Sequence, residues 1–119
     1  WSMPMRTVPE DVDLEHLQQR HLTFHAAQGN DVRAGLRLGE RLVRAGLELV
    51  EFRGTYLMGP VQVGMRSPPW AAREAMVAAG VATEGDVARW AGAFARFDAA
   101  TTRATQFVPM FTAVGRRRA

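Results

Sequence analysis

The spacing of apolar residues predicts two helices in the first part of the chain, after a loop over residues 1–12. The apolar face of the first helix consists of Leu14, Leu17, His21 and Phe24. Asp13 is placed to cap its first turn, and Gly29 with the following asparagine is a stop signal. A second helix ending at an alanine-glycine pair completes the helical segment, residues 13–45.

Two segments rich in strand-forming residues frame the second half of the chain. LELVEF predicts a strand over residues 47–53, and a strand directly after helix and glycine is typical of an α/β unit. Residues 54–66 contain three glycines and a proline, so we expect an irregular extended segment there. QFVPMFTAV predicts a last strand over residues 106–114. Because proline removes a ladder donor, Pro109 predicts that this strand lies at a sheet edge or is bulged.

The pattern between these strands predicts a helical layer over residues 68–103. Ser67 followed by two prolines is a helix-entry signal. Thr83 and Asp86 resemble a capping box that opens the clearest helix of the chain. The apolar stripe of this helix consists of Val87, Trp90, Phe94 and Phe97. Aromatic residues at this spacing are usually core, and they can also form the inner wall of a lid over an apolar substrate.

Two predicted strands are too few for a sheet that is stable by itself. LELVEF is apolar on both faces, and a strand buried on both faces belongs inside a larger sheet with helices on each side. This pattern favours the end of an α/β sheet whose beginning is elsewhere. A small α+β domain, in which four helices cover one hairpin, fits the pattern equally well.

Composition excludes several classes of protein and leaves an ordinary globular one. The chain has 119 residues, of which 47% are hydrophobic and 23% charged, and its net charge of +3 is too small to indicate nucleic-acid binding. No cysteine is present, so neither a disulfide nor a thiolate metal site is expected. No apolar run reaches the length of a membrane span and no secretory leader is present, so we expect a cytoplasmic protein without membrane contact. Trp1 is not a usual native start.

Several segments, taken in order, are similar to one enzyme family. The first segment consists of Arg33-Ala34-Gly35 and Ala45-Gly46-Leu47 and leads into LELVEF. The second segment is WAAREAMVAAGVATEGDVARWAGAF, and the last is FVPMFTAVGRR. They resemble the C-terminal region of class I S-adenosylmethionine-dependent methyltransferases, especially bacterial ones of the ubiquinone/menaquinone-biosynthesis type. In that family the segments are a helix with the sixth strand, a helical insertion, and the final antiparallel strand. Many relatives carry arginine where this chain has Leu36.

The resemblance implies the C-terminal part of a Rossmann-like sheet, with its last two strands antiparallel and a helical insertion between them. It also implies methyl transfer from S-adenosylmethionine to a small-molecule acceptor. The family binds this cofactor at a Gly-rich turn and an acidic residue in its N-terminal half. This chain contains no G-x-G, so we expect no cofactor-binding residue in it. The N-terminal half of the same fold, or a complementing chain, would be its partner, and the chain alone should be inactive.

Candidate substrate-binding residues come from two places. His21 and His25 lie one helical turn apart, and in methyltransferases of this shape the segment after the fifth strand can reach the substrate. Tyr56 and Met58 follow LELVEF, and ligands in α/β sheets bind beyond the carboxyl ends of strands, so we expect these two residues and the loop of residues 1–5 to line the pocket. The histidine spacing suits a metal, but no third ligand is evident, so we expect none. Catalytic residues stay unassigned.

Other functions fit the same residues. A non-catalytic or repurposed module could bind a small apolar ligand or a protein through the aromatic helix face. A nucleic-acid contact through the C-terminal arginines is the weakest of these hypotheses, because a solvated tail explains them. The sequence leaves a homodimer open.

Overall fold

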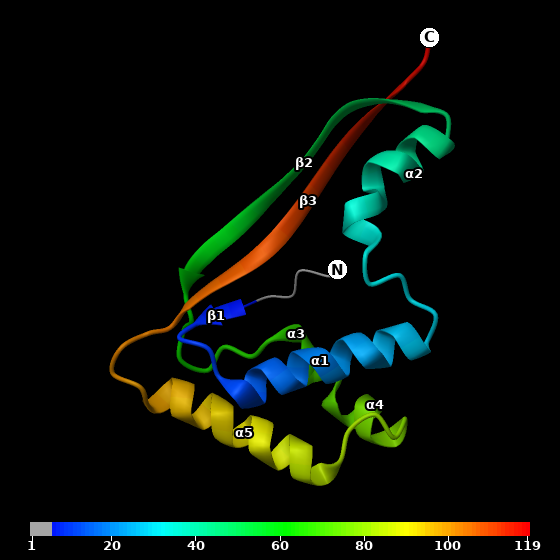
Figure 1. Cartoon of the computed structure of the whole chain (residues 1–119). Helices are drawn as coiled ribbons and strands as arrows, with labels where there is room; N and C mark the ends of the chain where they lie inside the picture. The colour runs from blue at the N-terminus through cyan, green and yellow to red at the C-terminus, as the bar shows by residue number, and fades with distance from the viewer. Residues whose placement is uncertain (1–5) are drawn as a thin grey trace.

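The computed structural model describes residues 6–119 as an α/β fold with a three-stranded sheet. The strands are β1 (Arg6–Val8), β2 (Leu47–Pro60) and β3 (Thr105–Arg117). The helices are α1 (Val12–Ala27), α2 (Leu38–Arg44), α3 (Pro68–Ala71), α4 (Arg73–Ala78) and α5 (Glu84–Ala99), with a 3-10 turn, η1 (Ala34–Arg37), ahead of α2. In Figure 1, α1, α3, α4 and α5 gather at one end of the sheet, and α2 lies along the ribbon of β2 and β3.

The last strand, β3, lies in the middle of the sheet, because the strand order is β1-β3-β2. It is antiparallel to both neighbours, which confirms the expected antiparallel pairing of the last two strands. The predicted edge position is wrong for β3 as a whole. At Pro109 itself β3 is nevertheless an edge within residues 6–119, because β1 pairs with β3 only as far as Phe107, and proline is tolerated at an edge.

Strand β2 is longer than the pattern predicted, since its pairing with β3 continues to Pro60 opposite Thr105. The irregular segment expected from residue 54 onward therefore begins only after residue 60. Gly54 does not break the strand, because it pairs with Phe111 and the phenyl ring of Phe111 covers it. An aromatic side chain over a strand glycine supplies the contact that the glycine lacks.

The first segment also departs from its predicted boundaries. Residues 6–8 form β1 rather than loop. The carboxylate of Asp11, not that of Asp13, caps α1, accepting from the amides of Asp13 and Leu14. The second predicted helix is divided into η1 and α2.

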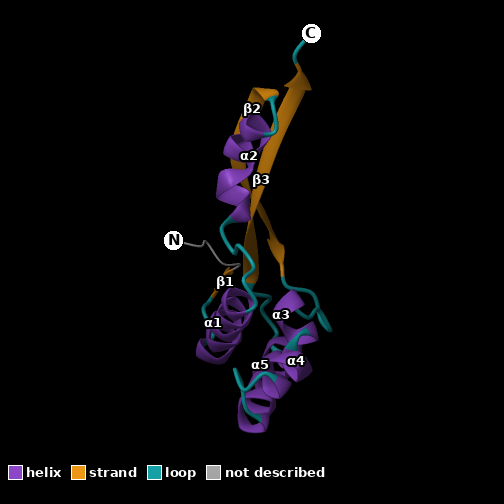
Figure 2. Cartoon of the chain, turned by 90° about the vertical axis from the view of Figure 1, so that its right-hand side faces the viewer, coloured by secondary structure: helices purple, strands orange, loops and turns teal. Residues whose placement is uncertain are grey.

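The core lies in the helical layer and not under the sheet. Leu17 of α1, Met76 of α4 and Trp90 of α5 are its largest fully buried side chains. Trp90 is thereby confirmed as core, and Thr83 and Asp86 form the predicted capping box of α5. Figure 2 shows α2 in front of the β2–β3 ribbon, and Figure 1 shows no described helix on the other side of the ribbon. Among the described residues, no helix combines the length and apolarity needed to cross a membrane.

Candidate functional site

A cavity of about 170 Å³ opens where the sheet meets the helical layer. Thr7 of β1 and Val61, the first residue after β2, both line it. Since β1 and β2 are each antiparallel to β3, they run parallel to one another, and the cavity lies at the carboxyl end of both. Open α/β sheets bind ligands at this place.

The inner wall of the cavity is apolar. It is formed by Leu14, Met65, Pro68, Phe94 and Phe97. The two phenylalanines lie three residues apart on α5, so both reach the same side of that helix. Phe94 is held by the Trp70 ring, 5.3 Å away edge to face, and by the Arg66 guanidinium, 4.7 Å from the ring centroid. A wall of fixed rings suits a flat apolar ligand.

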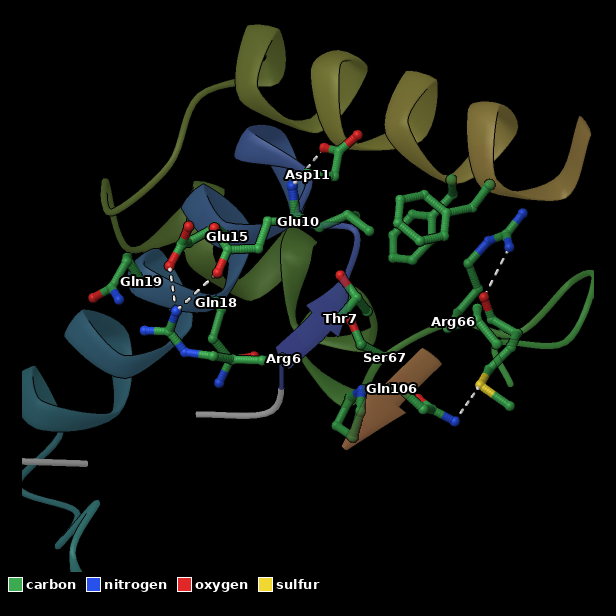
Figure 3. A pocket seen from close by; sticks show the side chains of 16 residues that line it. Arg6, Thr7, Glu10, Asp11, Glu15, Gln18, Gln19, Arg66, Ser67 and Gln106 are labelled. Atoms are coloured by element: carbon green, nitrogen blue, oxygen red, sulfur yellow. Dashed lines mark hydrogen bonds and ion pairs between the residues drawn. The ribbon is translucent and has the colours of Figure 1, made fainter. Parts of the chain in front are cut away.

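The charged groups around the cavity are already paired with one another. The Arg6 guanidinium lies 3.3 Å from a Glu10 carboxylate oxygen and 3.6 Å from one of Glu15. The Arg66 guanidinium lies 2.8 Å from a carboxylate oxygen of Asp98. Figure 3 shows the two arginines on opposite sides of the view. Neither arginine is left as a free cation for a ligand.

One ion-paired clamp fixes the loop that forms one wall of the cavity. The carboxylate of Asp98, at the end of α5, accepts from the Gly64 amide at 2.9 Å as well as from Arg66. The hydrogen bond from Arg66, and then that from Gly64, hold the pKa of Asp98 below its ordinary value. The loop after β2 is thereby tied to α5.

A second clamp joins the start of α1 to α5. The Arg96 guanidinium donates to Asp11 at 2.9 Å and to Asp13 at 3.0 Å. Asp13 also accepts from Arg89 at 3.2 Å, and the hydrogen bond from Arg96 is the largest cause that lowers the pKa of Asp13. The two clamps fix the α1 and loop walls against the aromatic wall.

Three uncharged polar side chains face the cavity without partners. Thr7, Gln18 and Ser67 line it and are half-buried, and no side-chain hydrogen bond joins them to any other residue of the described part. In Figure 3, Thr7 and Ser67 lie between the Arg6 and Arg66 sides. These hydroxyl and amide groups can therefore hydrogen-bond a ligand.

The structure brings the two predicted histidines together outside the cavity. The Nε2 atoms of His21 and His25 are 2.9 Å apart, and the Nδ1 atom of His25 lies 2.9 Å from the side-chain nitrogen of Asn30. Burial, and then the charge of His25, lower the pKa of His21. Residues 6–119 contain no group of three or more potential metal ligands. The pair lies on α1 beyond the residues that line the cavity, and its role in substrate binding stays a prediction.

Tyr56 and Met58 are placed together on β2 and also do not line the cavity. They lie inside the strand and not after it, because β2 extends to Pro60. The Tyr56 ring packs edge to face on Phe107 at 5.8 Å, and Met58 is 71% exposed. The carboxyl end of the strand is at Pro60, next to Val61 of the cavity, so a role of Tyr56 and Met58 in substrate binding stays a prediction. Residues 1–5, also proposed for the site, lie outside the described part.

The resembled family binds its cofactor at a turn whose composition differs from that of the turn after β1. Its Gly-rich turn would follow a parallel strand, but the turn after β1 is Pro9-Glu10-Asp11 and contains no glycine. A side chain at each of these positions prevents the close approach to a ligand that glycine permits. The residues present do not fit S-adenosylmethionine in the expected manner.

Comparison with known proteins found no match among family models, curated proteins or solved structures.

Proposed function

We propose that this chain is the acceptor-binding part of an S-adenosylmethionine-dependent methyltransferase, and that its cavity holds the small molecule that is methylated. The observation that carries the proposal is the place of the cavity, at the carboxyl ends of two parallel strands. The chain would orient and enclose the acceptor, and positioning is the main requirement of a displacement reaction. No catalytic residue is assigned.

The strand directions support a Rossmann-like origin for the sheet. Strands β1 and β2 run in the same direction on either side of β3 and are connected through α1 and α2. Both pairings in the described sheet are antiparallel, and doubly wound sheets often carry an antiparallel strand at their edge. The third strand, β1, distinguishes this sheet from a single hairpin covered by helices.

The dimensions of the chain support a partner that completes the sheet. Its radius of gyration is 17.3 Å, whereas a compact domain of this length has about 13.5 Å. Strand β1 pairs only with β3 within the described part, so its other edge is available to a further parallel strand. We propose that a cofactor-binding half, in the same polypeptide or in a complementing chain, adds there.

The proposal is tested by comparing the chain with the protein encoded when its reading frame is extended upstream of Trp1. We expect the longer protein to transfer a labelled methyl group from S-adenosylmethionine to at least one compound in a panel of small neutral and anionic acceptors, and the 119-residue chain to transfer none. Calorimetric titration of the chain alone with S-adenosylmethionine should give no heat of binding. Micromolar binding of S-adenosylmethionine by the chain alone would contradict the proposal.

A ligand-binding module without catalysis is the second candidate. It is favoured by the cavity itself, whose walls are all supplied by this chain. The two candidates differ in their need for a partner. Ligand binding by the chain together with absence of methyl transfer by the extended protein would favour the module.

A further inference from the structure

We propose that the cavity selects an uncharged aromatic ring that carries a hydrogen-bonding substituent, a simple phenol being the smallest example. The inference depends on the proposed function only in identifying this ligand as the methyl acceptor. It rests on three properties of the cavity: its size, its aromatic wall and the balance of charge around it.

The volume of the cavity sets the size of the ligand. Its 170 Å³ is close to the roughly 150 Å³ of a protein cavity that holds benzene. One six-membered ring therefore fits, and a longer chain would have to extend through the open side. Phe94 and Phe97 can contact a ring by stacking or by edge-to-face packing, which adds to the gain from burial.

The charges around the cavity disfavour an anion. Glu10, Asp11 and Glu15 line it, against two arginines, and both arginines are already bound to carboxylates. An anionic ligand would have to break one of these pairs or lie beside carboxylates without a counter-ion, and a charge buried in that way is unfavourable.

The uncharged polar groups favour a hydroxyl substituent. The hydroxyl groups of Thr7 and Ser67 have no partner in the described part, and each can both donate and accept. A phenolic hydroxyl can form the complementary hydrogen bonds. A methyl group in the same place would leave these groups without a partner, which lowers affinity.

The inference is tested by titrating the 119-residue chain with small ligands and following amide shifts by NMR. We expect phenol to shift resonances of Thr7, Ser67 and Phe97, and to bind more tightly than toluene. Benzamide and benzoate have nearly the same shape and differ in charge. We expect benzoate to bind at least about tenfold more weakly than benzamide, because no cation is free to pair with it.

Two variants locate the hydroxyl preference. Thr7→Val keeps the branched shape and removes the hydroxyl, and Ser67→Ala does the same for the second group. Each should weaken phenol binding about two- to tenfold and leave toluene binding unchanged. Thr55→Val, on the exposed part of β2, is the matched control and should change neither. Circular dichroism verifies that each variant is folded.

Three outcomes would overturn the inference: benzoate binding as tightly as benzamide, phenol shifting resonances only outside the cavity, or both variants behaving as the control does. Methylation of an anionic acceptor by the extended protein would contradict the inference and leave the proposed function intact. Phenol binding at the cavity without any methyl transfer by the extended protein would contradict the proposed function and leave the inference intact.

Discussion

Individual aspartates set the acid stability of the walls around the cavity. Arg66 and the Gly64 amide lower the pKa of Asp98 from an ordinary value of 3.8. A carboxyl group with a lowered native pKa stabilises the fold above its unfolded pKa, and this stability is lost as the pH falls through the native value. The loop wall should therefore loosen at acid pH before the apolar core does.

Replacing this aspartate isolates its contribution. Asp98→Asn should lower the melting temperature at pH 7, and the difference from the parent chain should close as the pH falls below 3.8. The reason is that a protonated aspartate and an asparagine both lack the charge that pairs with Arg66. Thermal melts followed by circular dichroism between pH 2.5 and pH 7 measure the effect. Glu74→Gln, whose side chain is 86% exposed, is the control, and an equal pH profile for both variants would contradict the argument.

The residue that caps α5, Thr83, also contributes to stability by itself. The Thr83 hydroxyl accepts from the Asp86 amide at 3.1 Å, and the Asp86 carboxylate accepts from the Thr83 amide at 2.9 Å. Thr83→Ala should lower the free energy of unfolding by about 1 kcal/mol. Urea unfolding checks this, with the exposed Thr101→Ala as control. Equal losses in the two variants would show that the cap contributes nothing.

At the scale of elements, the helical layer is tightly packed and the sheet is not. Met76 of α4 has no exposed surface, while Met58 of β2 is 71% exposed. Met76→Ala should therefore lower the free energy of unfolding by about 2–5 kcal/mol, and Met58→Ala should leave it nearly unchanged. Urea unfolding of the two variants compares the packing of the helical layer directly with that of the sheet. A large loss at Met58 would indicate that the sheet is covered in solution.

The contact of η1 with the sheet depends on a glycine. A Cβ atom at Gly35 would lie 2.5 Å from Cδ2 of Phe111, so the ring or the turn would have to move. Gly35→Ala should lower the free energy of unfolding by about 1–3 kcal/mol. Gly59→Ala, which meets no atom within 4 Å, is the matched control for urea unfolding. Equal effects at both positions would contradict this close approach.

The sequence predicted the helices and strands better than it predicted which of them lie side by side. The capping box of α5 was predictable because it depends on residues close in the chain, and Trp90 was predictable as core because it lies on the apolar stripe of α5. The extension of β2 through Gly54 depends on the Phe111 ring opposite, which no local pattern reveals. The middle position of β3 depends on β1, whose three residues were too few for a strand signal.

The residues predicted for substrate binding do not line the cavity, and their role stays a prediction. The aromatic stripe of α5, which the sequence singled out as core or as the wall of a lid, contains Phe94 and Phe97 of the cavity wall. The clamps were missed, because Arg66 and Asp98 are 32 residues apart and charge alone does not pair them. Nothing in the spacing of Thr7 and Ser67 indicated that they share a cavity.

At the scale of the whole molecule, the sheet leaves apolar side chains uncovered. On the face of the β2–β3 ribbon opposite α2, the exposed apolar side chains include Leu57, Met110 and Val114. An antiparallel sheet can leave one face in water when that face is polar, but here the uncovered face carries apolar side chains. The chain by itself should therefore associate as its concentration rises.

This association can be measured and weakened at one position. Sedimentation velocity should show species larger than the monomer that grow with concentration, and Leu57→Lys should reduce them. Val63→Lys is the control, because Val63 is 67% exposed but lies in the loop after β2. A chain that stays monomeric at all concentrations, or equal effects of the two lysines, would contradict the role of this face.

The middle position of β3 determines when the sheet can form during synthesis. Every described strand pairing involves residues 105–117, and β1 and β2 do not pair with each other. Until residues 105–117 have left the ribosome, β1 and β2 have no strand partner within residues 6–119, although α1 and α5 can already meet. The helical layer should therefore fold first, and the sheet should close only after residues 105–117 have emerged. A stop codon shortly before Thr105 would remove every described strand pairing while retaining all of the described helices.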